Sequence, residues 1–67
     1  MRAIDFISYL FFDHHCDLKT NGQNVNVIKG AKRAMFHLPF MKTGKVRIEE
    51  VRQVCKALGI AEPKMKL

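Results

Sequence analysis

No carboxylate side chain occurs anywhere between Lys19 and Arg47, although this stretch carries seven cations. The whole chain has 67 residues and a formal net charge of +6, so the positive charge is concentrated in its middle. The seven cations are Lys19, Lys29, Lys32, Arg33, Lys42, Lys45 and Arg47. A block of one charge sign favours an anionic partner, most often nucleic acid, or else an acidic protein surface.

Cysteine and long apolar runs are also scarce. The only cysteines are Cys16 and Cys55, which form no C-x-x-C motif, so free thiols are favoured over a disulfide framework. The one apolar run, Ala3–Phe12, is interrupted by Asp5 and is far shorter than the roughly 20 residues of a membrane span. We therefore predict a cytoplasmic protein without a membrane anchor.

The motifs of enzymes are missing as well. The chain has no glycine-rich phosphate loop and no paired-carboxylate constellation, and Ser8 is its single serine. A single domain of 67 residues buries only roughly 60% of its unfolded surface, which leaves little structure from which to build a cleft. We predict a protein that is not an enzyme and has no cofactor.

Hydrophobic periodicity divides the chain into three segments. In the first, residues 3–15, apolar residues recur at helical spacing, although the many aromatic and β-branched residues make a strand the competing interpretation. Its length favours a helix. In the third, residues 47–59, apolar residues recur at i, i+3, i+7 and i+10, and Gly59 supplies a stop.

The middle segment, residues 25–38, is predicted to form the second helix and to end before Pro39. One face would be apolar, with Ile28, Ala31, Met35 and Leu38. The other face would carry Lys29, Lys32, Arg33, Phe36 and His37. Gly30 would weaken this helix by roughly 1 kcal/mol relative to alanine.

These segments predict a small all-α domain of three helices spanning residues 1–67. Loops are expected at 17–24, around the turn residues Asn21 and Gly22, and at 39–46, with a tail at 60–67. A short extended piece is expected near Val46. Because the first helix is apolar on more sides than two short helices can cover, we also expect a homodimer.

The predicted binding surface combines the cationic helix face with the basic loop that follows it. Its residues are Lys29, Lys32, Arg33, Phe36, His37, Lys42, Lys45 and Arg47. The cations would neutralise phosphates, and the two rings would add local contacts to a base. The alternative use of the same residues is a solvated face that keeps a small protein soluble.

A cluster of polar residues, Asp13 to Asp17, resembles metal-binding chemistry because it contains His14, His15 and Cys16. Adjacent residues cannot all turn to one ion, and only His37 and Cys55 could complete a zinc site from elsewhere. The spacing matches no zinc finger or ribbon. We therefore predict no metal site and interpret the cluster as a polar helix end.

The stretch Thr43–Gly59 resembles the second half of an EF-hand in the positions of Gly44, Val46 and Glu50. The first, third and fifth loop positions would be Pro39, Met41 and Thr43, none of which is a carboxylate or an amide, so calcium binding is not expected. The same stretch also resembles the first helix and turn of a helix-turn-helix. Only six residues follow Ala61, which leaves no room for a recognition helix.

The sequence thus predicts a small nucleic-acid-binding or regulatory protein, with DNA preferred over RNA. The alternative is a small protein-binding inhibitor or adaptor, of the kind that mobile elements encode, docked on an acidic surface of a host protein.

Overall fold

A computed structural model describes residues 1–40 and 44–64 of the chain. Three consecutive strands are flanked by helical segments, so the fold is α/β and the prediction of an all-α domain was wrong. In chain order the elements are α1 (Ala3–Ser8), a π-helical continuation η1 (Tyr9–Asp13), β1 (Asp17–Asn21), β2 (Asn24–Lys29), β3 (Lys32–His37) and α2 (Ile48–Leu58).

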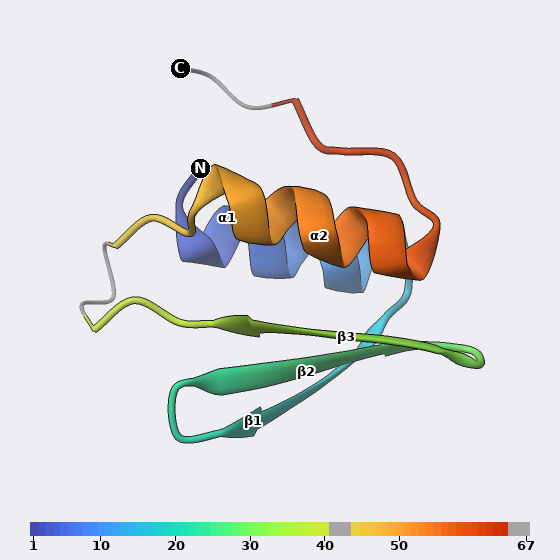
Figure 1. Cartoon of the computed structure of the whole chain (residues 1–67), viewed down its shortest axis with the longest axis horizontal. Coiled ribbons are helices and arrows are strands. Elements are labelled where there is room, and N and C mark those ends of the chain that lie inside the picture. Colours follow the sequence, from blue (N-terminus) through green and yellow to red (C-terminus); the bar gives the residue numbers. More distant parts are fainter. Residues whose placement is uncertain (41–43, 65–67) are drawn as a thin grey trace.

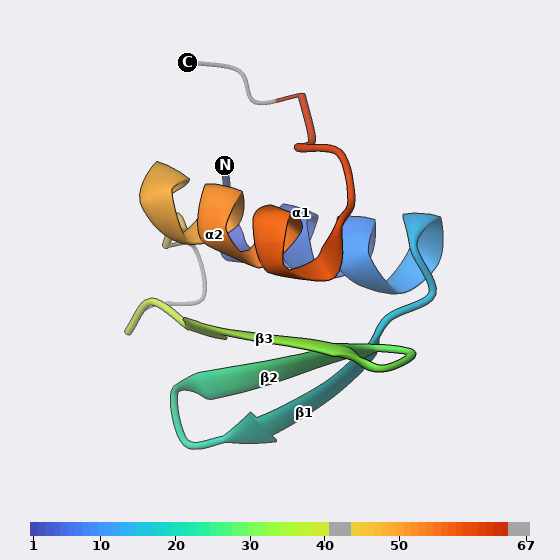
Figure 2. The same ribbon diagram turned by 45° about the vertical axis from the view of Figure 1, so that its right-hand side comes forward.

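The strands form one antiparallel sheet in the order β1-β2-β3. Both helices lie on the same face of this sheet, which gives a two-layer molecule (Figure 1). The view in Figure 2, turned by 45°, shows the same arrangement. The opposite face of the sheet is covered by no other element of residues 1–40 and 44–64.

The predicted helix 25–38 is instead the hairpin of β2 and β3. Val25 and Val27 alternate with exposed or half-exposed asparagines and are 1% and 0% exposed, which is the period-two pattern of a half-buried strand. Gly30 has a φ of +62° and lies in the turn between the strands. Glycine adopts this left-handed conformation without the steric cost that other residues incur, so it connects the hairpin rather than interrupting a helix.

The predicted loop 17–24 contains strand β1. Leu18 is paired with Val27, and Thr20 with Val25, which continues the core-facing side of β2 onto the neighbouring strand. The turn expected around Asn21 and Gly22 is present, since Gly22 has a φ of +63°. The turn was therefore predicted correctly, whereas the two strands that it connects were not predicted.

The two outer helices lie where the sequence predicted them. Helix α2 ends at Gly59, whose φ of +68° forms a left-handed cap, and its buried stripe includes Val51 and Leu58. The expected extended piece near Val46 is also present, because Lys45 forms an isolated antiparallel bridge with Arg2. Within residues 1–40 and 44–64, no helix is long and apolar enough to cross a membrane.

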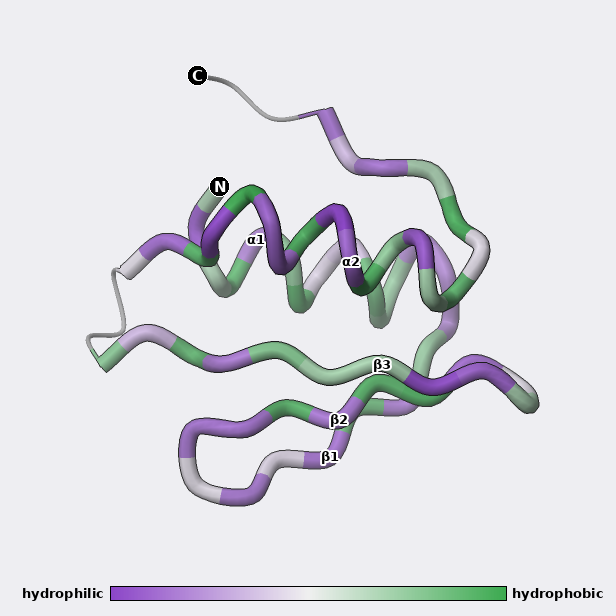
Figure 3. The backbone as a smooth tube through the Cα atoms, viewed as in Figure 1, coloured by the Kyte–Doolittle hydropathy of each residue, from purple (hydrophilic) through white to green (hydrophobic). Residues whose placement is uncertain are grey.

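The core lies between the two layers. The rings of Phe6 in α1 and Phe36 in β3 are both fully buried, with their centroids 5.0 Å apart. Hydrophilic and hydrophobic residues alternate along α2 and β2 in Figure 3, in keeping with elements that bury one side only. Glu50 and His37, on the two layers, meet at the edge of this core and begin the site described next.

Candidate functional site

The structure separates the residues that the sequence assigned to one cationic helix face. In a strand, neighbouring side chains point to opposite faces of the sheet. The pairing of Val25 with Phe36 and of Val27 with Ala34 places the even-numbered residues of β3 on the side of the helices. Arg33 therefore points to the other face, away from Lys32 and Phe36. His37 has the same register position as Arg33, but at the strand end its ring lies beside Glu50 of α2.

Two of the predicted binding cations contact the backbone of other elements of the fold. The Nζ atom of Lys29 donates a hydrogen bond of 2.9 Å to the backbone carbonyl of His14. The ammonium of Lys32 lies over the C-terminal end of α2, where a Cβ atom added at Gly59 would be 2.6 Å from Nζ. A cation at this end of a helix is favoured by the helix dipole.

Phe36 is 0% exposed and packs against Phe6, so it belongs to the core and to no surface. Lys42 lies outside the described residues. The predicted binding residues that are exposed in the structure are Lys32, Arg33, His37, Lys45 and Arg47.

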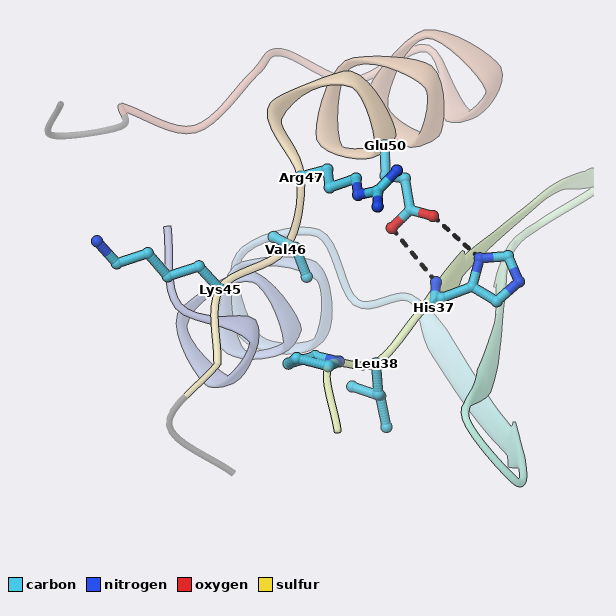
Figure 4. Close-up of a pocket in the computed structure, with 7 residues that line it drawn as sticks. His37, Leu38, Lys45, Val46, Arg47 and Glu50 are labelled. Atoms are coloured by element: carbon cyan, nitrogen blue, oxygen red, sulfur yellow. Dashed lines mark hydrogen bonds and ion pairs between the residues drawn. The ribbon is translucent and has the colours of Figure 1, made fainter. Parts of the chain in front are cut away.

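Three of these residues line a hollow of about 410 Å³ between the end of β3 and the start of α2. We call it the cationic hollow; it is lined by His37, Leu38, Pro39, Lys45, Val46, Arg47 and Glu50. Figure 4 shows that its residues come from two chain segments, the end of β3 and the run that leads into α2.

The imidazole of His37 lines one side of the cationic hollow. Its Nδ1 atom lies 3.0 Å from Oε1 of Glu50, and the backbone N–H of His37 reaches Oε2 of the same carboxylate at 3.5 Å. The Glu50 side chain is 24% exposed and that of His37 is 60% exposed. The carboxylate thus holds the end of β3 to the first turn of α2, while the ring stays open to solvent.

The backbone between the two cations of the hollow, Lys45 and Arg47, is held in place by a hydrogen bond. Val46 between them is 5% exposed, and its N–H donates a hydrogen bond of 3.0 Å to the carbonyl of Met1. Because Val46 is anchored inward, the flanking side chains of Lys45 and Arg47 are exposed. In Figure 4, Arg47 extends beside the Glu50 carboxylate, whereas Lys45 extends outward in another direction.

The uncovered side of the sheet forms a second polar surface, which we call the bare face. By the strand register its residues are Asp17, Lys19, Asn21, Asn24, Asn26, Ile28, Arg33, Met35 and His37. Seven of these nine carry polar or charged side chains. Lys19 and Arg33 flank Asn26 around a shallow hollow of about 280 Å³.

His37 connects the bare face to the cationic hollow. It pairs across the sheet with Asn24, which in turn pairs with Asn21, and it also lines the hollow. Sequence reasoning did not identify Asn24 and Asn26 as surface residues. The alternation Asn24-Val25-Asn26-Val27 is the signal that could have placed both amides on one exposed face.

Both cysteines belong to the hydrophobic core. Cys16 and Cys55 are free thiols, each 1% exposed, and burial raises the pKa of both above the ordinary thiol range. Among residues 1–40 and 44–64, no group of three histidine, cysteine, aspartate or glutamate side chains is placed to hold a metal ion.

Comparison with known proteins gives no assignment for the chain: no protein-family model, curated protein or solved structure matches it.

Proposed function

We propose that the protein binds nucleic acid with the bare face and the cationic hollow, in a binding role without catalysis. The observation that carries this proposal is that His37, Lys45 and Arg47 line one hollow. These residues lie on two segments of the chain, and the same His37 continues into a surface flanked by Lys19 and Arg33.

The charged residues supply affinity in this proposal. Lysine and arginine side chains neutralise phosphates and release condensed counterions, which makes binding dependent on salt. Four exposed cations, Lys19, Arg33, Lys45 and Arg47, are available on the two surfaces. If all four meet phosphates, the slope of log K against log salt concentration is about −3 to −4.

The asparagines of the bare face supply hydrogen bonds to base edges. An asparagine side chain can bond the N6 and N7 atoms of adenine in the major groove. The major groove of B-DNA, roughly 12 Å wide, admits a two-stranded β-ribbon, and the three asparagines lie on the paired strands β1 and β2, about 4.8 Å apart. The deep and narrow major groove of A-form RNA does not admit such a sheet.

The composition of the bare face also favours a duplex over a single strand. Single-strand binders stack successive bases on aromatic side chains. Among the nine residues of the bare face, only His37 has an aromatic ring, so the face offers no stacking platform. Duplex DNA is therefore the proposed ligand.

Fluorescence anisotropy with labelled duplex DNA, duplex RNA and single-stranded DNA of one length tests the proposal. We expect the tightest binding at low salt to duplex DNA. Binding to none of the three would overturn a nucleic-acid function and favour the acidic surface of another protein as the partner. Tightest binding to single strands would overturn the role given to the bare face.

A further inference from the structure

The two ring nitrogens of His37 have different surroundings. The Nδ1 atom lies 3.0 Å from Oε1 of Glu50, and the backbone N–H of His37 reaches Oε2 of the same carboxylate at 3.5 Å. The side of the ring that carries Nδ1 therefore faces Glu50. The Nε2 atom lies on the far side of the ring from this carboxylate (Figure 4). Because the His37 side chain is 60% exposed, Nε2 is the nitrogen that a ligand can reach.

The contact with Glu50 decides which nitrogen of the neutral ring carries the proton. A neutral imidazole has one N–H donor and one acceptor, whereas an ionised carboxylate can only accept. Because Nδ1 is within hydrogen-bond distance of Oε1 of Glu50, the proton belongs on Nδ1. The Nε2 atom of the neutral ring then has a lone pair and no hydrogen, so it offers no hydrogen bond to the oxygen atoms of a phosphate.

Protonation of the ring changes both the hydrogen bonding and the charge of the cationic hollow. An imidazolium has an N–H at each nitrogen, so Nε2 becomes a donor while Nδ1 keeps its contact with Glu50. Among the described residues, the charged groups that line the hollow beside His37 are Lys45, Arg47 and Glu50. Their net charge is +1, and an imidazolium raises it to +2. Asn24, the strand neighbour of His37, is uncharged.

We infer that His37 is a proton-dependent contact for a DNA phosphate. The inference rests on the DNA-binding function proposed above. Duplex DNA that lies on both the bare face and the cationic hollow meets His37, because this residue belongs to both surfaces. The imidazolium donates a charge-assisted hydrogen bond from Nε2 to a phosphate oxygen, which the neutral ring cannot do. DNA binding is then coupled to the uptake of a proton, so the affinity for DNA falls as the pH rises.

Fluorescence anisotropy with duplex DNA at constant ionic strength, from about pH 5.5 to about pH 8, tests the coupling, because a histidine side chain changes its charge in this range. We expect the affinity to fall about fivefold across the range, the size of one charge interaction at contact distance in water. His37→Asn should remove most of this pH dependence, since an asparagine amide can keep a hydrogen bond to Glu50 but takes up no proton. Equal affinity of the unaltered protein at both ends of the range would overturn the inference.

His15→Asn is the matched control for the loss of a histidine. His15 is exposed, precedes β1 and lines neither the bare face nor the cationic hollow. Its φ of 55° is left-handed, a conformation that asparagine tolerates. The pH dependence of DNA binding should remain in this variant. An equal loss of pH dependence in both variants would show that only total charge matters and would overturn the role of His37.

NMR spectroscopy of the imidazole nitrogens tests the tautomer in the absence of DNA. At about pH 8, where the ring is neutral, Nδ1 of His37 should have the chemical shift of a protonated nitrogen and Nε2 that of an unprotonated one. Glu50→Ala should remove this preference, because the acceptor is lost. The opposite tautomer in the unaltered protein would overturn the inference even if DNA binds. If duplex DNA binds at no pH, the proposed function fails and the role of His37 fails with it, whichever tautomer is found.

Discussion

The Nδ1 atom of His37, at the end of β3, lies 3.0 Å from Oε1 of Glu50 in the first turn of α2. This contact joins the two layers at the rim of the cationic hollow, next to Lys45 and Arg47. It also places a carboxylate inside a surface that we propose to bind phosphates. Glu50 should therefore position His37 and at the same time weaken the attraction of the hollow for an anion.

Replacing Glu50 separates these two effects. Glu50→Gln keeps an acceptor for the imidazole and removes the negative charge, so duplex DNA should bind about two- to fivefold more tightly at low salt, the size of one exposed charge interaction. Glu49→Gln is the matched control, because Glu49 is the preceding residue and does not line the hollow. Equal gains for both variants in an anisotropy titration would show that only net charge matters.

The position of Phe36 distinguishes a strand from the predicted helix. Phe36→Leu should destabilise the protein by about 1 kcal/mol and Phe36→Ala by about 3–5 kcal/mol, because Phe36 fills the core against Phe6. Met35→Ala, on the bare face, should change the free energy of unfolding by less than about 0.5 kcal/mol. Urea denaturation measures all three. A larger effect at Met35 than at Phe36 would contradict the strand register.

Gly59 should be sensitive to substitution because of its backbone conformation. Gly59→Ala should cost about 1 kcal/mol, since an L-residue at a φ of +68° is strained. The nearby Nζ atom of Lys32 is the far end of a flexible side chain and can move aside. The same cost is therefore expected in a Lys32→Ala background. A cost that disappears in that background would assign it to the clash with Lys32 instead.

Because of the buried thiols, the free energy of unfolding should fall as the pH rises into the alkaline range. Burial raises the pKa of Cys16 and Cys55 in the folded state, so above about pH 8.5 the unfolded chain loses protons that the folded chain keeps. The contribution of the two thiols to the free energy of unfolding is fully present below that pH and is lost as the pH rises toward their folded-state pKa. In urea denaturation between about pH 7 and pH 10, the Cys16→Ala, Cys55→Ala double variant should lose stability less steeply than the unaltered protein. Equal slopes would contradict this.

Local signals predicted the elements that depend on local interactions. The spacing of apolar residues located α2, and Gly59 located its end. The segment from Val25 to Leu38 was different, because it fits two periods at once. Its helical spacing is as regular as its alternation, and the pairing of β2 with β1 decides between them. That pairing involves residues outside the segment, so no reading of the segment alone could reveal it.

The candidate site was predicted in part. His37, Lys45 and Arg47 were expected to bind a partner, and the structure brings them to one hollow. Their carboxylate neighbour Glu50 was named only in the EF-hand resemblance, because its contact with His37 requires the sheet to be in place. Lys32 and Arg33 were expected side by side, which adjacent residues of a strand cannot be.

The salt dependence of duplex DNA binding tests the central claim most directly. Lys45→Ala with Arg47→Ala should make the slope of log K against log salt concentration shallower by about 2, because two phosphate contacts are lost. Lys56→Ala with Lys64→Ala removes the same charge from exposed residues outside both surfaces and should leave the slope nearly unchanged. Equal changes for the two double variants, or no binding by the unaltered protein at low salt, would contradict the account.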